Sequence, residues 1–328
     1  MIGFIKNYWF FIGIGAMVIL AFSAPSLGLF VRQHHILEAG IFVAFFITGM
    51  TLDTSDVARQ FGRVKVLLAA LISSLLLFPV AVYFAAHVFF ATHSDFIVGA
   101  LIIAAAPVTI ASGTVMTGVA KGNISLSLFI CVLSNIAAIF SIPPLLNVLI
   151  GTTVSIDLPV REMITGLIVT ILIPTTAGQA LQPKVRRFTQ AHAKNISVFN
   201  QCIVLLIIFN AVAGSTARLI DSASSIVEVF LFMAVIHAGF LFFNYRLAKF
   251  IKLDPPSVSA FTIHTSQKTL TVSYLVWAGY LADSFPTALI PCIAYHLTQS
   301  VCDTILAAKL GRQAEAAAYR TKPLETAG

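Results

Sequence analysis

The sequence predicts an all-α membrane protein with ten transmembrane helices. Of its 328 residues, 58% are hydrophobic and only 10% are charged, and the mean hydropathy is +0.94. This composition leaves too little polar surface to cover a water-soluble globule. The apolar residues form long unbroken runs rather than alternating ones, which argues against a membrane β-barrel. Because a bilayer-spanning helix needs about 20 apolar residues, a chain of this length holds about ten of them.

The apolar runs place the individual spans in chain order. They lie near residues 8–30, 35–54, 64–90, 96–120, 123–151, 160–182, 196–217, 224–248, 256–282 and 284–308. The first run ends in Ala-Phe-Ser-Ala at residues 21–24, which also resembles the end of a secretory signal peptide. We interpret it as a span, because nine further spans follow and it completes the symmetry described below.

The basic residues predict the orientation of the spans. If the N-terminus is cytoplasmic, one side receives only Arg32, Arg161 and Arg218. The other side receives sixteen basic residues: Lys6, Arg59, Arg63, Lys65, Lys121, Lys184, Arg186, Arg187, Lys194, Arg246, Lys249, Lys252, Lys309, Arg312, Arg320 and Lys322. Because short basic loops stay in the cytoplasm, both termini are predicted there, in a multi-pass protein of the inner (plasma) membrane. The same loops account for the net charge of +7, so no nucleic-acid partner is inferred.

Ten spans also predict an internal symmetry. Five spans that begin inside end outside, so the next five run in the opposite direction, as in the inverted repeats of secondary transporters. We predict a first repeat at residues 1–151, a second at 152–310 and a cytoplasmic tail at 311–328. The fourth and ninth spans correspond under this repeat, and they are the most polar and most interrupted of the ten.

The fourth span contains two residues that weaken a helix. Pro107 removes a backbone donor and Gly113 lowers helix propensity, which predicts a break near Ser112 to Thr114. Irregular backbone at that depth is tolerated only where it is buried in protein or lines a cavity. The alternative is a Pro-kinked helix whose Ser and Thr hydroxyls bond to their own carbonyls.

The ninth span begins with the helix-start signal Asp254-Pro255-Pro256 and then meets six consecutive polar residues, His264 to Thr269. Among them, Lys268 would cost roughly 2.5–3.5 kcal/mol at the centre of a membrane helix, so such a residue marks a functional site by default. The alternative is a displaced span in which Lys268 extends to the membrane interface.

Other polar residues within spans have two interpretations each. In the tenth span His296 and Gln299 lie one helical turn apart, with Asp303 a turn further on. They face the same cavity as spans four and nine, or His296 serves helix packing and Asp303 lies near the cytoplasmic interface. Ser134, Asn135 and Asn210 have the same two interpretations, because polar side chains also form hydrogen bonds between helices in lipid.

Motifs of other protein classes are not found in the sequence. There is no nucleotide-binding loop, dinucleotide fingerprint or zinc-peptidase motif, so neither an ATP-driven pump nor an enzyme is predicted. The adjacent His34 and His35 do not share a helix face, so they predict no metal site. Neither a disulfide nor a metal site is predicted for the four cysteines, which lie in apolar runs: Cys131, Cys202, Cys292 and Cys302.

A resemblance to a known family rests mainly on residues 111–134. The pattern Ala-Ser-x-x-Val-Met-Thr at 111–117, followed by Ala-Lys-Gly-Asn at 120–123 and Leu-Ser at 126–127, resembles the bile acid:sodium symporter family, especially its SBF-like branch. The resemblance extends over nearly the whole chain in span number. It implies a core of spans three to five and eight to ten, and a panel of spans one, two, six and seven. Spans four and nine would cross at the binding site.

The resemblance also implies site residues. The family's sodium ligands map onto Ser112, Thr114, Ser127, Cys131, His264, Thr265 and Gln267. The chain departs from the family where it has Gly113 in place of Asn, with a one-residue insertion, His264 in place of Glu, and Cys131 in place of a hydroxyl. Hard cations prefer oxygen ligands, so these changes weaken the case for two sodium sites. The ammonium of Lys268 is a candidate substitute for one sodium ion, which leaves sodium coupling, proton coupling and uncoupled transport open.

We therefore expect a secondary active transporter that couples Na⁺ or H⁺ to the symport of a small organic anion by alternating access. The expected substrate and coupling residues are Lys268, His264, Gln267, Thr269, Ser112, Thr114, His296 and Gln299. No cofactor is expected besides the coupling ion, and the protein would act in the lipid bilayer as a monomer or homodimer. The alternative is a non-transporting membrane regulator, or a sensor of ion or lipid homeostasis, that retains the fold.

Overall fold

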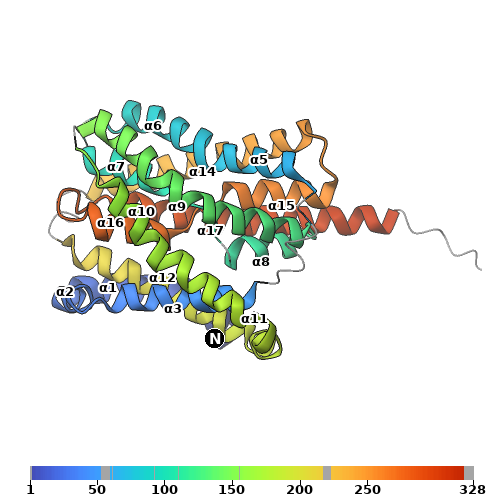
Figure 1. Cartoon of the computed structure of the whole chain (residues 1–328), viewed down its shortest axis with the longest axis horizontal. Helices are drawn as coiled ribbons and strands as arrows, with labels where there is room; N and C mark the ends of the chain where they lie inside the picture. The colour runs from blue at the N-terminus through green and yellow to red at the C-terminus, as the bar shows by residue number, and fades with distance from the viewer. Residues whose placement is uncertain are drawn as a thin grey trace, which may run out of the picture.

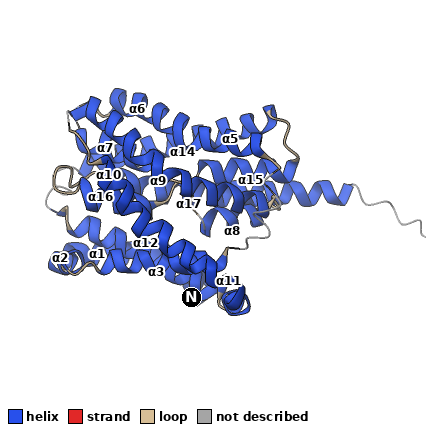
Figure 2. Cartoon of the chain, viewed as in Figure 1, coloured by secondary structure: helices blue, strands red, loops and turns tan. Residues whose placement is uncertain are grey.

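The computed structural model describes residues 2–52, 60, 62–91, 93–109, 111–154, 156–216 and 223–320. All the regular secondary structure in these residues is helical (Figure 2). The prediction of an all-α protein is confirmed for this part of the chain. Arg59, Arg218 and Lys322, which contribute to the predicted orientation, lie outside the described residues, as does the end of the predicted tail at 321–328.

The predicted first span is not one straight helix. It consists of α1 (Ile2–Ser23) and α2 (Pro25–Gln33), and the chain turns by 96° between them. Pro25 explains the turn, because a proline disfavours the helical conformation of the residue before it and is well placed at the start of a new helix. Ala24, the residue before it, has extended backbone with φ −141°.

Two further spans each contain a widened turn. The third is continuous through α5 (Val64–Ile72), the π-helical turn η1 (Ser73–Leu77) and α6 (Phe78–Phe89). In η1 the N–H of Phe78 donates to the carbonyl of Ser73, one residue further back than in an α-helix, and Pro79 follows. The sixth span repeats this pattern, with Pro174 in the position of Pro79, through α10 (Val160–Leu167), η2 (Ile168–Leu172) and α11 (Ile173–Ala191).

The other predicted spans correspond to single helices or to pairs. The single helices are α3 (Ile36–Thr51), α9 (Ile124–Val154), α12 (Ala193–Ala213), α14 (Ala223–Phe250) and α17 (Leu289–Arg320). The pairs are α7 (Ser94–Ala105) with α8 (Ala111–Val119), and α15 (Pro255–Ser266) with α16 (Leu270–Tyr280). Beyond the predicted end of the tenth span at 308, α17 continues to Arg320 through an Ala-rich segment of high helix propensity.

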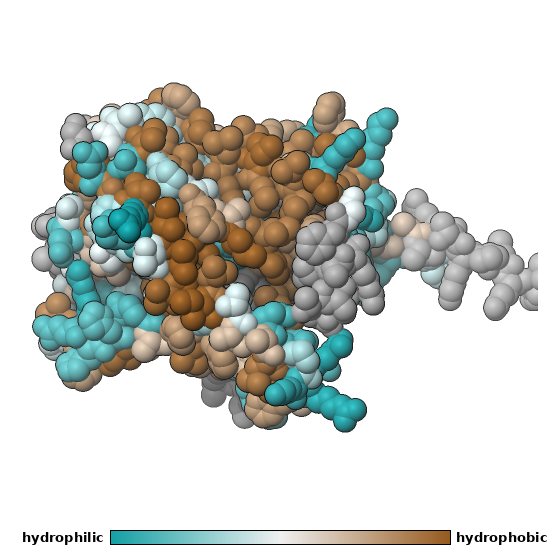
Figure 3. Space-filling model, viewed as in Figure 1, coloured by the Kyte–Doolittle hydropathy of each residue, from teal (hydrophilic) through white to brown (hydrophobic). Residues whose placement is uncertain are grey.

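Five helices are long and apolar enough to cross a membrane, and the bent α1–α2 pair would make a sixth. The five are Val64–Phe89, Ile124–Val154, Val160–Ala191, Ala193–Ala213 and Ser225–Phe250. Large apolar side chains such as Phe242, Val235 and Val88 are exposed on the outside of the bundle, where lipid would cover them. Figure 3 shows apolar side chains across the middle of one face and polar ones toward its ends. Ten crossings and the inverted repeat remain predictions.

Two groups of helices build the bundle. Contacts join α1, α2, α3, α11 and α12, which lie in the lower part of the molecule in Figure 1. Here α3 and α11 approach so closely that a Cβ on Gly49 would collide with the carbonyl of Thr175, and one on Gly178 with that of Phe46. In the other group α14 contacts α15 and α17, while α7 contacts α6, α9 and α17.

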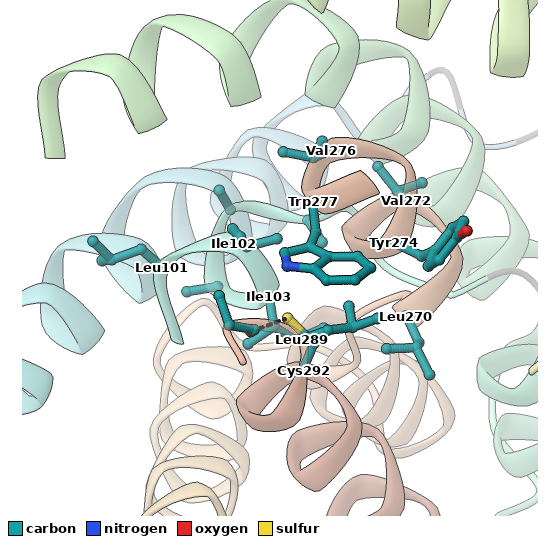
Figure 4. Close-up of a cluster of buried hydrophobic side chains, with 14 of the residues drawn as sticks. Leu101, Ile102, Ile103, Leu270, Val272, Tyr274, Val276, Trp277, Leu289 and Cys292 are labelled. Carbon is teal, nitrogen blue, oxygen red and sulfur yellow. Dashed lines mark hydrogen bonds between the residues drawn. The ribbon is translucent and has the colours of Figure 1, made fainter. Parts of the chain in front are cut away.

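An apolar cluster fastens α7, α16 and α17 together. Figure 4 labels ten of its residues: Leu101, Ile102, Ile103, Leu270, Val272, Tyr274, Val276, Trp277, Leu289 and Cys292. The thiol of Cys292 donates to the carbonyl of Gly99 at 3.3 Å, and the indole of Trp277 donates to the carbonyl of Phe285 at 2.9 Å. These contacts hold the two helices that lead into and out of the interrupted segments.

Candidate functional site

The first interruption separates α7 from α8 at residues 106–109. The predicted break near Ser112 to Thr114 is wrong in position, because both residues lie within α8. Pro107 explains the difference, since it lacks an N–H and disfavours helical backbone at Ala106, which is extended with φ −60° and ψ 151°.

The second interruption lies at Gln267 to Thr269, between α15 and α16. It follows directly on the first half of the predicted polar run. The two interruptions contact each other, because the N–H of Thr269 donates to the carbonyl of Pro107 at 2.9 Å. In Figure 1, α7 and α16 lie toward one end of the molecule and α8 and α15 toward the other, so this contact lies between four half-helices.

Side chains from α9 and α17 satisfy the backbone groups that the two breaks free. Ser134 accepts from the N–H of Val108 at 3.2 Å, and Asn135 donates to the carbonyl of Val108 at 3.1 Å. Gln299 does the same for the second break, accepting from the N–H of Lys268 and donating to its carbonyl, both at 2.8 Å. These polar residues therefore hold irregular backbone in a buried position, as such a break requires.

Lys268 is fully buried and points into the protein. Its Nζ donates to the carbonyl of Ser74 at 2.6 Å, to the Ser74 hydroxyl at 3.0 Å and to the carbonyl of Ala106 at 2.9 Å. The ring of Phe78 lies 5.0 Å from the same atom. The alternative in which this side chain extends to the membrane interface is therefore wrong. Sequence reasoning missed Ser74, although two adjacent serines in an apolar run could have indicated it.

The ammonium of Lys268 lies at the C-terminal end of α7, beside carbonyl oxygens that accept no hydrogen bond within a helix. Ala106 follows the last residue of α7, so its carbonyl belongs to the partially negative end of that half-helix. The carbonyl of Ser74 is free because the N–H of Phe78 bonds to Ser73 and Pro79 has none. A cation here satisfies three oxygens at once.

A second cluster surrounds His264, also fully buried. Its Nδ1 is hydrogen-bonded to the Ser127 hydroxyl, which in turn accepts from Thr117 at 3.1 Å. The α8 helix passes close by at Gly113, where a Cβ would lie 2.7 Å from the His264 ring. The Nε2 of His264 and the hydroxyl of Thr265 have no hydrogen-bond partner among the described residues.

Gln267 joins the hydroxyls of Ser112 and Thr109 to a buried carboxylate. Its Oε1 accepts from the Ser112 hydroxyl at 3.1 Å, and Ser112 shares a hydrogen bond with the Thr109 hydroxyl at 2.9 Å. Its Nε2 donates to Asp303 at 2.6 Å, and Asp303 also bonds to His237 at 2.9 Å. Asp303 is fully buried and contacts the second break through Gln267, which favours a place in the site over one near the cytoplasmic interface.

The predicted sodium ligands thus do not gather at one site. Ser112 and Gln267 come together with Thr109, and their oxygens are suited to a hard cation. Ser127 is instead bonded to the imidazole of His264. Cys131 is buried in an apolar cluster with its sulfur 3.5 Å from the amide of Asn135, which does not suit a hard cation. Thr114 is half-buried on α8.

A cavity of about 100 Å³ lies beside the two interruptions. Its lining comes from both breaks, from α9 and α17, and from α3 and α12 on the opposite side: Ala44, Phe45, Thr48, Val108, Thr109, Asn135, Asn200, Ile203, Val204, Thr269, Leu270, Thr271 and His296. His296, predicted as a site residue, lines this cavity and lies 3.1 Å from Gln299. A more apolar cavity of about 200 Å³ shares Phe45 and Asn135 with it and continues toward Ile136 and Ile171.

Known proteins resemble the chain over most of its length. Residues 8–312 match the SBF-like CPA transporter family. The chain is 27% identical over 323 residues to the probable sodium/metabolite cotransporter BASS4, chloroplastic, of Oryza sativa subsp. japonica, covering 93% of this chain and 76% of that protein. It is 22% identical over 316 residues to sodium/bile acid cotransporter 7-B of Xenopus laevis, covering 92% of this chain and 91% of that protein.

Proposed function

The chain belongs to the SBF-like CPA transporter family, and we propose that it moves a small organic anion across the cell membrane by alternating access, coupled to Na⁺ or H⁺. The family is one of transporters, so the protein is a multi-pass membrane transporter and not an enzyme. The observation that carries the proposal is the direct contact of the two interruptions, Thr269 to Pro107, beside a cavity that both of them line. Discontinuous helices that meet in this way form the binding sites of many secondary transporters.

An organic anion fits the ends of the half-helices that border the cavity. Thr269, Leu270 and Thr271 surround the start of α16, and Val108 and Thr109 precede the start of α8. Helix starts carry about half a positive charge and free N–H groups, so both favour an anionic group in the cavity. The adjoining apolar cavity would accept a hydrocarbon part, which favours an amphipathic anion.

The cation would bind where oxygen atoms gather. We propose that Na⁺ binds at Ser112, Gln267 and Thr109, and that the ammonium of Lys268, at the negative end of α7, acts as a fixed cation in place of a second one. Sodium appears in the names of the relatives, which favours Na⁺ over H⁺ for this chain. Proton coupling through Lys268 is the alternative that the experiment below separates.

The inverted repeat is supported by the way the two breaks are held. Asn135 on α9 binds the backbone of the first break, and Gln299 on α17 binds that of the second. These helices are the fifth and tenth predicted spans, which correspond under a repeat of residues 1–151 and 152–310. We further propose that spans three to five and eight to ten form the core that moves relative to spans one, two, six and seven, with both termini in the cytoplasm.

Reconstitution into liposomes tests the proposal. Uptake of labelled anions, from a small carboxylate to a bile acid, would be measured under an inward Na⁺ gradient, an inward H⁺ gradient or neither. We expect saturable accumulation that the Na⁺ gradient drives and that Lys268→Met abolishes, while Lys309→Met, which removes an exposed lysine of α17, has no effect. Unchanged sodium-driven uptake in Lys268→Met and Lys268→Ala would remove Lys268 from the mechanism. Absence of accumulation under every gradient would favour a non-transporting regulator.

A further inference from the structure

Asp303 is a buried carboxylate whose two oxygens both have partners. On α17 its side chain is fully buried, with Oδ1 2.9 Å from Nε2 of His237 on α14 and Oδ2 2.6 Å from Nε2 of Gln267 in the second break. A carboxylate without a proton only accepts hydrogen bonds. The amide group of Gln267 must therefore turn its NH₂ toward Asp303.

This requirement fixes the other end of the same amide. With NH₂ on Asp303, Oε1 faces the opposite way, toward the Ser112 hydroxyl at 3.1 Å and the glycine surface of α8 at Gly113. A free glutamine amide has two orientations that differ only in the exchange of O and N. The reversed orientation would direct an NH₂ group at Ser112 and an oxygen at the carboxylate, so Asp303 excludes it.

His237 holds Asp303 through a closed ring of hydrogen bonds. Tyr295 donates its hydroxyl proton to the carbonyl of Ser266 at 2.7 Å. Its oxygen must then accept from Nδ1 of His237 at 3.0 Å, while Nε2 of His237 meets Asp303. The ring closes through Gln267, the residue that follows Ser266, so the backbone of the break and the side chain orientation of Gln267 are tied together.

We propose that Asp303, held by His237, is a positioning residue that determines the ion specificity of the site. It turns the side-chain oxygen of Gln267 toward Ser112 and Thr109, so that a cation meets three oxygens. In the reversed orientation the cation would meet an N–H group of Gln267, which would repel it. The inference rests on the proposed sodium site and names the residue that gives it its polarity. Asp303 acts through Gln267 and does not itself face the cation.

The substitution Asp303→Asn separates orientation from charge. An asparagine can accept from Gln267 with its oxygen and donate to Nε2 of His237 with its NH₂, which preserves the arrangement without a charge. Asp303→Leu removes the acceptor and leaves Gln267 free to turn. Tyr295→Phe is a milder change that frees His237, and it serves if Asp303→Leu does not fold.

The test measures the stabilisation of the purified full chain by Na⁺, with choline chloride at equal ionic strength as the reference. The Na⁺ concentration that gives half of the maximal stabilisation is expected to rise at least tenfold in Asp303→Leu and severalfold in Tyr295→Phe. In Asp303→Asn it should rise less than about threefold. Asp95→Asn is the matched control, because that carboxylate binds Thr287 before α17 and lies outside the ring. In a Gln267→Leu background, Asp303→Leu should add no further change if it acts through Gln267.

The outcomes distinguish failure of the positioning role of Asp303 from failure of the proposed sodium site. The positioning role would be overturned if the half-saturating Na⁺ concentration were unchanged in Asp303→Leu and Tyr295→Phe. It would also be overturned if Asp303→Leu raised that concentration as much in the Gln267→Leu background as it does alone. Either result would leave the sodium site intact. Failure of the unaltered protein to respond to Na⁺ at all would overturn the proposed sodium coupling, and the inference with it.

Discussion

Gly113 on α8 lies directly against the imidazole of His264 on α15. A Cβ at Gly113 would come within 2.7 Å of that ring and 2.9 Å of Oε1 of Gln267, closer than real Cβ atoms approach other atoms. Gly113→Ala should therefore push α8 away from the second break. We expect uptake to fall at least tenfold and the melting temperature to fall by several degrees, since overpacking costs about 1–3 kcal/mol.

Gly118→Ala is the matched control for this prediction. It lies on the same helix, and its Cβ would meet only Ile124 at 3.7 Å, an ordinary contact. It should leave uptake unchanged and raise stability slightly, because alanine favours helix over glycine. Equal effects of the two substitutions would show that α8 responds to a lost glycine in general and not to the contact with His264.

Lys268→Met should destabilise the fold in addition to its effect on transport. The substitution leaves the carbonyls of Ser74 and Ala106 buried without a donor, and each such group costs about 1–3 kcal/mol. A lower melting temperature in detergent than that of Lys309→Met would agree with this. If the melting temperature rises instead, desolvation of the ammonium costs more than these hydrogen bonds return.

Gln299→Leu should weaken the second break and leave the first intact. The leucine removes both hydrogen bonds to the backbone of Lys268 while it fills a similar volume. We expect loss of stability of about 1–3 kcal/mol and faster hydrogen exchange at residues 267–269 than at 106–109. Asn135→Leu should reverse this order, because it removes the hydrogen bond to Val108. Identical exchange patterns in both variants would contradict the assignment of the first break to α9 and of the second to α17.

Filling the apolar cavity should discriminate among substrates by size. Ile136 lines it from α9, and Ile136→Trp would place a larger ring system in this cavity of about 200 Å³. Uptake of a bile acid should fall far more than uptake of a small carboxylate. A similar loss for both substrates would indicate that the cavity does not hold the hydrocarbon part of the anion.

Asp254, which lies outside the spans, gives a prediction about acid stability. Partial burial raises the pKa of its carboxyl, but hydrogen bonds from Ser257 and the charge of Arg63 outweigh this and hold the pKa below its ordinary value of 3.8. The carboxylate therefore stabilises the fold above the unfolded-state pKa, and this contribution disappears as the pH falls through the lower folded-state pKa. The difference in melting temperature between the unaltered protein and Asp254→Ala should shrink in acid. A difference that grows in acid would contradict the lowered pKa.

The sequence predicts the two interruptions because their causes are local. Pro107 disrupts a helix wherever it stands in one, and six polar residues from His264 to Thr269 are incompatible with a continuous apolar span. The first break nonetheless lies several residues before the predicted one, because Gly113 also weakens a helix and draws the prediction toward it. The structure shows that Gly113 serves close packing against His264, a tertiary contact that helix propensity does not contain.

Local sequence patterns do not reveal contacts between residues that lie far apart in the chain. His237 is a single histidine in an apolar helix, and its partner Asp303 lies 66 residues further on. Ser74 lies 194 residues before Lys268, in a span with no other sign of function. The local sequence identifies Lys268 as unusual. The groups that accept hydrogen bonds from its ammonium cannot be read from it, because they depend on the packing of α7 and η1 around the side chain.

Pro79 forms no hydrogen bond with Lys268, since it has no N–H, yet the placement of the ammonium depends on it. An alanine at this position would supply an N–H to the helix, and the carbonyl of Ser74 would have a choice of donors. Competition of this kind would loosen the lysine without altering any of the atoms around it. A residue that gives the ammonium no hydrogen bond can thus tune how firmly the transporter holds its own internal charge.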